Sequence, residues 1–131
     1  MLFRSVIIES PFRGGIKFGQ QQNATYARLC LHDSLMRGES PFASHLLYTQ
    51  VLNEQDLGQR TMGMKRAFKW YRHANLMAVY RDHGITQGMR KGIRVAKYYN
   101  IKIEFRTLAD WARAIEAGEY NGRSQKTRRA V

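Results

Sequence analysis

Residues 75–89 have the sequence NLMAVYRDHGITQGM, and the predicted fold is built outward from this segment. Its apolar run from Leu76 to Tyr80 is typical of a strand that is covered on both faces, as in a parallel sheet. A polar cluster follows the run, glycines flank the next turn, and Thr86 is placed to cap a helix. The stretch therefore predicts a buried strand, a turn and the first turn of a helix.

The chain on either side alternates between strand and helix patterns. The remaining predicted elements are a strand at 4–8, a helix at 24–37 capped by Asn23, a strand at 41–44, a helix at 53–74 capped by Asn53, a helix at 87–99, a strand at 101–105 and a helix at 107–118. This alternation predicts one α/β domain at 1–118, followed by a basic tail at 119–131. The expected architecture is a flavodoxin-like (Rossmann-like) three-layer sandwich with about four parallel strands in order 2-1-3-4 and helices on both faces.

The predicted strand order brings two polar segments together. The first and third strands are neighbours in this order, and open α/β sheets bind ligands outside the carboxyl ends of such strands. Glu9-Ser10-Pro11 follows the first strand and Asp82-His83-Gly84 follows the third. We therefore expect both segments to share one cleft, with His45 at its side.

The chemistry that these side chains could perform leaves alternatives open. A partly buried carboxylate at the end of a strand often has a raised pKa, which suits catalysis. Asp82 is suited to hold a ribose hydroxyl or to act as a base, or to form a salt bridge with Arg81. Two histidines can form an acid–base pair or a phosphate clamp, although most loop histidines do neither. The candidate catalytic residues are Glu9, Asp82, His45 and His83.

Two segments are predicted to bind phosphate. Loop glycines after Ser10 leave backbone N–H groups free, and Arg13 adds a guanidinium. The helix that begins near Thr86 presents the N–H groups of its first turn to anions. Tyr48 either stacks on a base or packs in the core. The candidate ligand-binding residues in these segments are Ser10, Arg13, Gly14, Tyr48, Gly84, Thr86, Gly88 and Met89.

The composition indicates an anionic partner. The 131 residues carry a formal net charge of +12, which attracts nucleotides, nucleic acid or an acidic protein. A solvated basic surface is the other interpretation, because no nucleic-acid-binding motif accompanies the charge. The residues of this predicted basic surface are Lys65, Lys69, Arg72, Arg90, Arg94, Lys97, Arg128 and Arg129.

The composition also predicts a compartment. Cys30 is the only cysteine, which favours a reducing cytoplasm, that of the host if the protein is phage-encoded. No apolar run approaches the length of a membrane span, so we expect no membrane partner. We expect no cofactor, and no metal site, because the two histidines lack a cysteine or a paired carboxylate.

Three motifs together resemble a known superfamily. They are Ser10-Pro11-Phe12 at the end of a first strand, Asn23 at the opening of the first helix, and Asp82 before the Gly84–Met89 turn. In this order and spacing, they are similar to the nucleoside 2-deoxyribosyltransferase-like superfamily. The segment PFASHLLYTQ at 41–50 is closer to small, uncharacterised, often phage-encoded domains within it.

The resemblance covers residues 5–106 and implies a pocket for a nucleoside or nucleotide. Active members cleave or transfer N-glycosidic bonds with a glutamate nucleophile near the start of the helix after the central strand. This sequence has no Asp or Glu from His83 through Lys102, and Gln87 stands near that helix start. The resemblance also adds Pro11, Phe12 and Asn23 to the candidate ligand-binding residues.

Two functions are compatible with these patterns. The first is recognition of a phosphorylated nucleoside, together with N-glycosidase or deoxyribosyltransferase chemistry in which Glu9 replaces the missing nucleophile. The second is a catalytically silent protein that sequesters a nucleotide signal or binds a host protein or nucleic acid. The resemblance further implies a homo-oligomer, since members of the superfamily often share sites between subunits.

Overall fold

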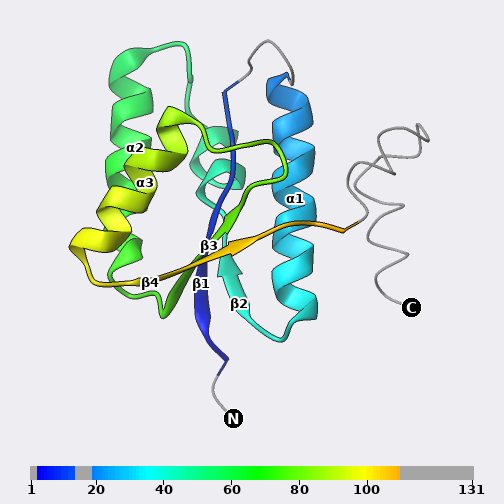
Figure 1. The fold of residues 1–131 in the computed structure, drawn as a ribbon. Coiled ribbons are helices and arrows are strands. Elements are labelled where there is room, and N and C mark those ends of the chain that lie inside the picture. The colour runs from blue at the N-terminus through cyan, green and yellow to red at the C-terminus, as the bar shows by residue number, and fades with distance from the viewer. Residues whose placement is uncertain (1–2, 14–18, 110–131) are drawn as a thin grey trace.

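The sheet has the strand order that the sequence predicts. A computed structural model describes residues 3–13 and 19–109. Four parallel strands lie in the order β2-β1-β3-β4, with bounds Ser40–Phe42, Ser5–Glu9, Leu76–Tyr80 and Lys102–Arg106 respectively (Figure 1). The central pair is in register from Val6 opposite Leu76 to Glu9 opposite Val79. The carboxyl ends of β1 and β3 therefore lie next to each other.

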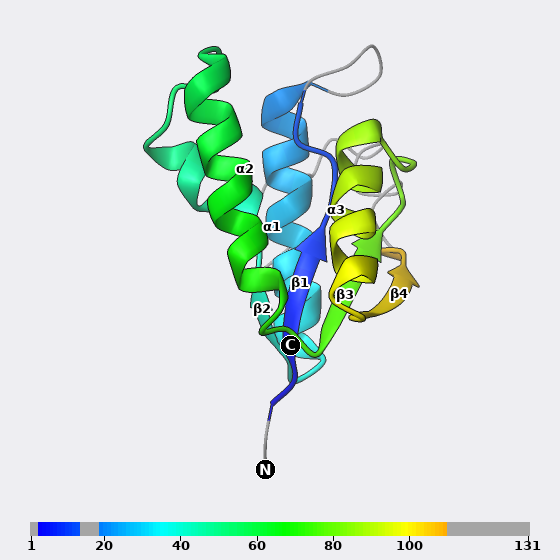
Figure 2. The ribbon, with the colours of Figure 1, turned by 90° about the vertical axis from the view of Figure 1, so that its left-hand side faces the viewer.

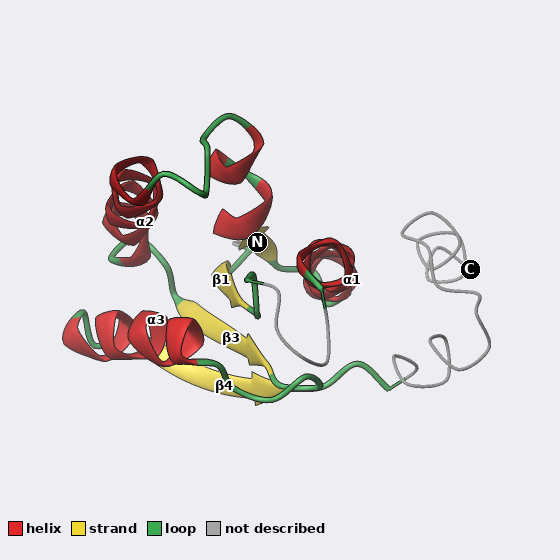
Figure 3. Cartoon of the chain, turned by 90° about the horizontal axis from the view of Figure 1, so that it is seen from above, coloured by secondary structure: helices red, strands yellow, loops and turns green. Residues whose placement is uncertain are grey.

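Helices cover both faces of the sheet, as expected for a three-layer sandwich. The long helices are α1 at Gln20–Met36, α2 at Leu57–Tyr71 and α3 at Gln87–Tyr98. Seen from above, α1 lies on one side of the strands and α2 and α3 lie on the other (Figure 3). Figure 2, viewed from the α2 and α3 side, shows these two helices on either side of β1.

The alternation of side chains along the strands gives each face its own core. Ile8 and Ala78 point toward α1, where they pack with the buried side chains of Tyr26 and Cys30. Residues of the opposite parity point toward α2 and α3. They are Ile7, Met77 and Val79, which pack with Tyr71, Met89 and Ala96.

The first two helices begin elsewhere than predicted, for identifiable reasons. Helix α1 starts at Gln20, because Gln22 Oε1 accepts the Gly19 N–H at 2.8 Å and so extends the helix before Asn23. Asn53 Oδ1 accepts the Gln55 N–H at 3.0 Å in a local turn, so α2 begins later. Asp56 caps α2 by accepting the Gly58 N–H at 2.9 Å.

Smaller differences concern the segment after β2. This edge strand ends at Phe42 instead of 44, and two short 3₁₀ helices follow, η1 at Ser44–Leu46 and η2 at Tyr48–Gln50. Pro41 is tolerated in β2 because an edge strand needs fewer backbone donors. Most of the predicted final helix, the predicted domain boundary at 118 and the tail at 119–131 lie outside the described residues.

Candidate functional site

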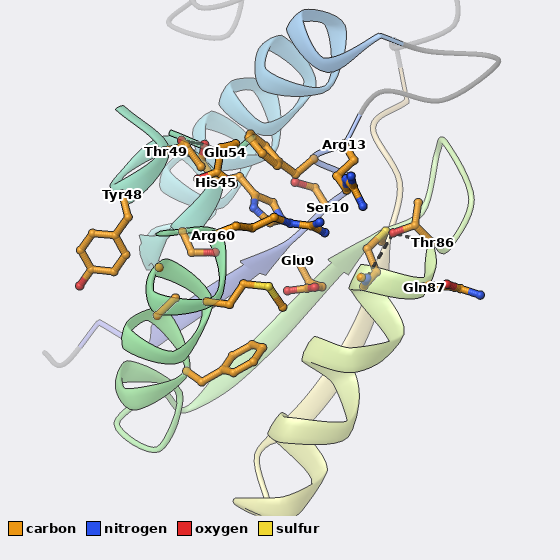
Figure 4. A pocket seen from close by; sticks show the side chains of 18 of the residues that line it. Glu9, Ser10, Arg13, His45, Tyr48, Thr49, Glu54, Arg60, Thr86 and Gln87 are labelled. Atoms are coloured by element: carbon orange, nitrogen blue, oxygen red, sulfur yellow. Dashed lines mark hydrogen bonds between the residues drawn. The ribbon is translucent and has the colours of Figure 1, made fainter. Parts of the chain in front are cut away.

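A cavity of about 390 Å³ opens at the carboxyl end of β1. Its walls come from the segment after β1, η1 and η2, the inner face of α2 and the first turn of α3 (Figure 4). This is the edge of the sheet at which open α/β folds bind ligands. The lining residues are Glu9, Ser10, Phe12, Arg13, Ser44, His45, Tyr48, Thr49, Glu54, Arg60, Gly63, Met64, Ala67, Phe68, Tyr71, Thr86, Gln87, Gly88 and Met89.

Glu9 is the buried acid of this cavity. It has the same parity as Ile7 and so points toward α2 and α3, where only 4% of its surface is exposed. Burial raises its pKa to about 8, against the opposing effect of Tyr71 Oη, which lies 3.2 Å from Oε2. The carboxyl group packs on α3 at Gly92, where an added Cβ would lie 2.5 Å from Oε1. At neutral pH Glu9 is therefore largely protonated.

Ser10 and His45 form the deep polar end of the cavity. Ser10 is 1% exposed, and its Oγ has no hydrogen-bond partner among the described residues. Burial lowers the pKa of His45 to about 4, while a bond with the Ser10 backbone acts in the opposite direction. The imidazole stacks on Phe12, with 5.0 Å between ring centroids. His45 is therefore neutral at pH 7 and acts as a hydrogen-bonding group, not as a cation.

Two guanidinium groups supply positive charge at this end. Arg13 comes from the segment after β1 and Arg60 from the first turn of α2, and both side chains point into the cavity (Figure 4). Neither forms a salt bridge with an acid of the described residues. Unpaired arginines beside a buried hydroxyl group make this end attractive to an anion.

The first turn of α3 adds backbone donors. Thr86 caps the helix as predicted, since its Oγ1 accepts the Met89 N–H at 3.2 Å. The N–H groups of Gln87 and Gly88 lie too early in the helix to reach an intrahelical carbonyl, and the helix dipole makes this end positive. The cavity therefore receives donors from three separate segments of the chain.

Asp82 and His83 lie apart from the cavity, on the α1 side. Asp82 accepts the Leu108 N–H at 2.8 Å through Oδ2, and its Oδ1 accepts the hydroxyl group of Tyr26. His83 stacks on the Tyr26 ring, with 4.0 Å between centroids. Asp82 has the parity of Tyr80 and Ala78, which places it on the opposite side of the sheet from Glu9. The prediction that both polar segments share one cleft is therefore wrong for the segment after β3, since Asp82 and His83 do not line the cavity.

Some of the other predicted ligand-binding residues line the cavity, whereas others lie outside it and hold neighbouring segments in place. Asn23 Nδ2 donates to the Arg13 carbonyl at 2.9 Å and so holds the segment after β1 against α1. Pro11 is buried within that segment. Gly84 lies in a turn and has a φ of +85°. Tyr48 lines the cavity, and its Oη accepts the Trp70 Nε1–H at 3.1 Å. Gly14 lies outside the described residues.

Sequence reasoning missed the contribution of α2. Met64, Ala67, Phe68 and Tyr71 keep helical spacing and line the cavity, and Arg60 lies four residues before Met64 on the same face of the helix. A single cation on an otherwise apolar helix stripe is the signal that could have found it. Glu54 carries no such signal, because it precedes the helix.

The predicted basic surface separates into two parts. Lys65, Lys69 and Arg72 are exposed on α2 away from the cavity. Arg90 and Arg94 face a groove beside it, whereas Lys97 is exposed farther along α3. Arg128 and Arg129 lie outside the described residues.

The described residues contain neither a cluster of metal ligands nor a membrane-spanning helix. No three His, Cys, Asp or Glu side chains of the described ranges lie close enough together to hold a metal ion. No helix within those ranges has the length and apolar character needed to cross a membrane.

Comparison with known proteins identifies a family. The sequence has no significant match among curated proteins. Residues 4–106, which include all four strands and the three long helices, match the family model described as Domain of unknown function (DUF7768). The chain therefore belongs to the DUF7768 family.

Proposed function

We propose that the cavity binds a nucleotide or a phosphorylated nucleoside derivative. The observation that carries the proposal is the buried Ser10 hydroxyl group, which has no partner among the described residues and lies in a cavity lined by Arg13 and Arg60. A buried hydroxyl group without a hydrogen bond is destabilising, so such groups usually meet a ligand or water. A phosphate group would accept from Ser10 and from both arginines.

The other end of the cavity suits the nucleoside. Met64, Ala67 and Phe68 form an apolar wall on α2, and the volume of about 390 Å³ falls within the range of small-molecule pockets. The resemblance to nucleoside 2-deoxyribosyltransferase-like proteins agrees with this class of ligand.

The protonated state of Glu9 favours hydrolysis of an N-glycosidic bond as the chemistry of this site. A carboxyl group with a pKa near 8 can donate its proton to the leaving base at neutral pH. The C–N bond would break as the base takes this proton, water would add to C1′ of the sugar, and the proton that the water releases would pass to the Glu9 carboxylate and restore the acid. This assigns Glu9 the role of acid, because a nucleophile would have to be ionised.

The test combines binding with product analysis. Nucleoside monophosphates with each common base are titrated into the protein by calorimetry, and the same mixtures are assayed for free base. We expect binding that weakens about tenfold or more in Ser10→Ala and in Arg60→Gln, since each removes a hydrogen bond to a charged group. Lys69→Gln removes an equal charge from the outer face of α2 and should bind normally.

Glu9→Gln separates binding from catalysis. The amide has the shape of the protonated acid but cannot donate a proton to the base, so we expect retained binding and lost base release. In the unmodified protein, base release should decline as the pH rises past about 8. Binding without base release at any pH identifies a silent binder, and absence of binding for the whole panel contradicts the proposal.

A further inference from the structure

A second hollow, of about 550 Å³, continues from the cavity into the groove between α2 and α3. The two hollows share Arg60, Met64, Gln87 and Gly88, so they meet at the first turn of α3. Three of the shared residues belong to the end of the cavity at which we place the phosphate. They are Arg60, which is a cation, and Gln87 and Gly88, whose backbone N–H groups lie in the first turn of α3. The remaining residues of the groove are Leu57, Thr61, Arg90, Lys91 and Arg94.

The groove is lined by cations without acids. Its four charged lining residues are Arg60, Arg90, Lys91 and Arg94, and no acidic residue lines it. None of the four forms a salt bridge within the described ranges, whereas Arg4, Arg37 and Arg106 each pair with an acid. The groove therefore holds several positive charges that the protein itself leaves uncompensated.

The positions of these charges suit a chain of phosphates. Arg90 and Arg94 are one turn apart on α3, and so lie on the same face of that helix. The positive end of the helix dipole adds to their field at the junction of the two hollows. Moving outward from Ser10, a ligand would meet Arg60 and the first turn of α3, and then Arg90 and Arg94.

We propose that the ligand carries a chain of at least two phosphates, with the first in the cavity and the others in the basic groove. This rests on the proposed function, because it assumes that the nucleoside and its first phosphate occupy the cavity. It narrows the ligand class from phosphorylated nucleosides in general to nucleoside diphosphates and triphosphates.

The experiment compares phosphate number across matched variants. Adenosine and guanosine mono-, di- and triphosphates are titrated by calorimetry at fixed ionic strength without divalent metal. We expect the triphosphate to bind the unmodified protein at least about tenfold more tightly than the monophosphate, since added charge-assisted contacts have that size. The variant Arg90→Gln/Lys91→Gln/Arg94→Gln should lose this advantage and bind the monophosphate as before.

The control removes the same number of charges elsewhere. Lys65→Gln/Lys69→Gln/Arg72→Gln alters the exposed face of α2 outside both hollows and should retain the triphosphate advantage. All altered side chains are exposed, and circular dichroism checks that each variant is folded.

Each other outcome overturns the inference. Equal binding of mono- and triphosphates would refute the phosphate chain and leave the proposed function standing, whereas failure of every nucleotide to bind would refute both. Equal loss in the control would assign the effect to overall charge. Affinity for a single-stranded oligonucleotide that exceeds that for the triphosphate and rises with its length would assign the groove to nucleic acid instead.

Discussion

Two buried glutamates, one on each side of the sheet, differ in how completely their carboxyl groups are hydrogen bonded. Glu39, on the α1 side, accepts hydrogen bonds from Nη1 and Nη2 of Arg106, each at 2.8 Å, and further hydrogen bonds from Ser34 and Arg4. Glu9, on the α2 and α3 side, has Tyr71 alone as a side-chain hydrogen-bond partner among the described residues. The bond from Arg106 is the largest cause that lowers the pKa of Glu39 to about 2, whereas burial raises that of Glu9 to about 8.

The difference separates internal structure from a site for a ligand. The Glu39 cluster continues through Arg106 to Tyr80 and Asp33, so its charges and hydroxyl groups are satisfied within the protein. The cavity around Glu9 contains an acid with a single side-chain hydrogen bond, a serine hydroxyl group without a hydrogen bond, and arginines without a salt bridge. Fully connected polar networks make a core specific, whereas buried groups left without partners are costly unless something else binds them.

Breaking the satisfied cluster should have the largest effect. Glu39→Gln removes the buried carboxylate that pairs with Arg106 and leaves the partly exposed Glu104 as the remaining paired acid among the described residues, so we expect a loss of about 3 kcal/mol in the free energy of unfolding. Glu9→Gln, the matched substitution in the cavity, should cost less than about 1 kcal/mol at pH 5, because the folded acid is neutral there. Urea denaturation of both variants measures the contrast, and similar costs would contradict it.

The pH dependence of stability should have opposite signs for the two acids. Glu9 is protonated when folded and ionised when unfolded between its ordinary pKa of 4.5 and about 8, so its contribution is lost as the pH rises through this window. Glu39 is ionised when folded down to about pH 2, so its contribution is lost as the pH falls below 4.5. The slope for either is at most about 1.4 kcal/mol per pH unit.

Variants isolate these slopes from other titrating groups. Stability is measured by urea denaturation from pH 5 to pH 8.5 for the unmodified protein and for Glu9→Gln. The unmodified protein should lose stability relative to Glu9→Gln as the pH rises, until the variant is the more stable of the two. A constant difference would show that Glu9 titrates normally. Below pH 6.5 the protonation of His45 adds its own loss, because its folded pKa is lowered to about 4, and this contribution cancels between the two proteins.

Two buried serines allow the same comparison, with smaller expected changes in the free energy of unfolding. Ser34 Oγ donates to Glu39 Oε1 at 2.7 Å, so Ser34→Ala should cost about 1–3 kcal/mol. Ser10 has no such bond, so Ser10→Ala should change stability by less than about 0.5 kcal/mol while weakening ligand binding. Thermal unfolding with and without a nucleotide separates the two effects, and equal costs without ligand would contradict the distinction.

Gly92→Ala should have a steric effect that is smaller than the cost of Ser34→Ala. A Cβ there would lie 2.5–2.8 Å from the carboxyl atoms of Glu9, which would have to move toward the cavity. We expect Gly92→Ala to cost about 1 kcal/mol, because the end of a side chain can yield. The cost should vanish in the double variant Glu9→Ala/Gly92→Ala relative to Glu9→Ala, and persistence of the cost would place the clash elsewhere.

The sequence predicted the frame of the molecule better than its polar contacts. The continuous apolar run at 76–80 and the Thr86 cap led to β3 and α3 as observed, and the alternation of elements led to the order 2-1-3-4. These features depend on local pattern and on general rules for parallel sheets. The placement of Glu9, Ser10 and His45 in one cavity followed from that frame.

The polar contacts depend on side chains that are distant in the sequence, and no local pattern predicts which of them meet. Asp82 seemed equivalent to Glu9 because both follow central strands, but Tyr26 and the Leu108 N–H engage it on the α1 side. Glu39 and Arg106 are 67 positions apart, and nothing near either one indicates the other. Counting parity past the strand ends would have separated Asp82 from Glu9, whereas the Glu39–Arg106 pair required the fold itself.

The most direct test of the central claim is to map where a nucleotide binds. A nucleoside monophosphate is titrated into ¹⁵N-labelled protein while the backbone amide signals are followed by NMR. We expect shifts concentrated at Ser10, Gly88 and Met89, with Leu108 and Glu39 unmoved. Shifts centred on the α1 side, or no shifts at millimolar nucleotide, would contradict the assignment of the cavity at the carboxyl end of β1 as the ligand site.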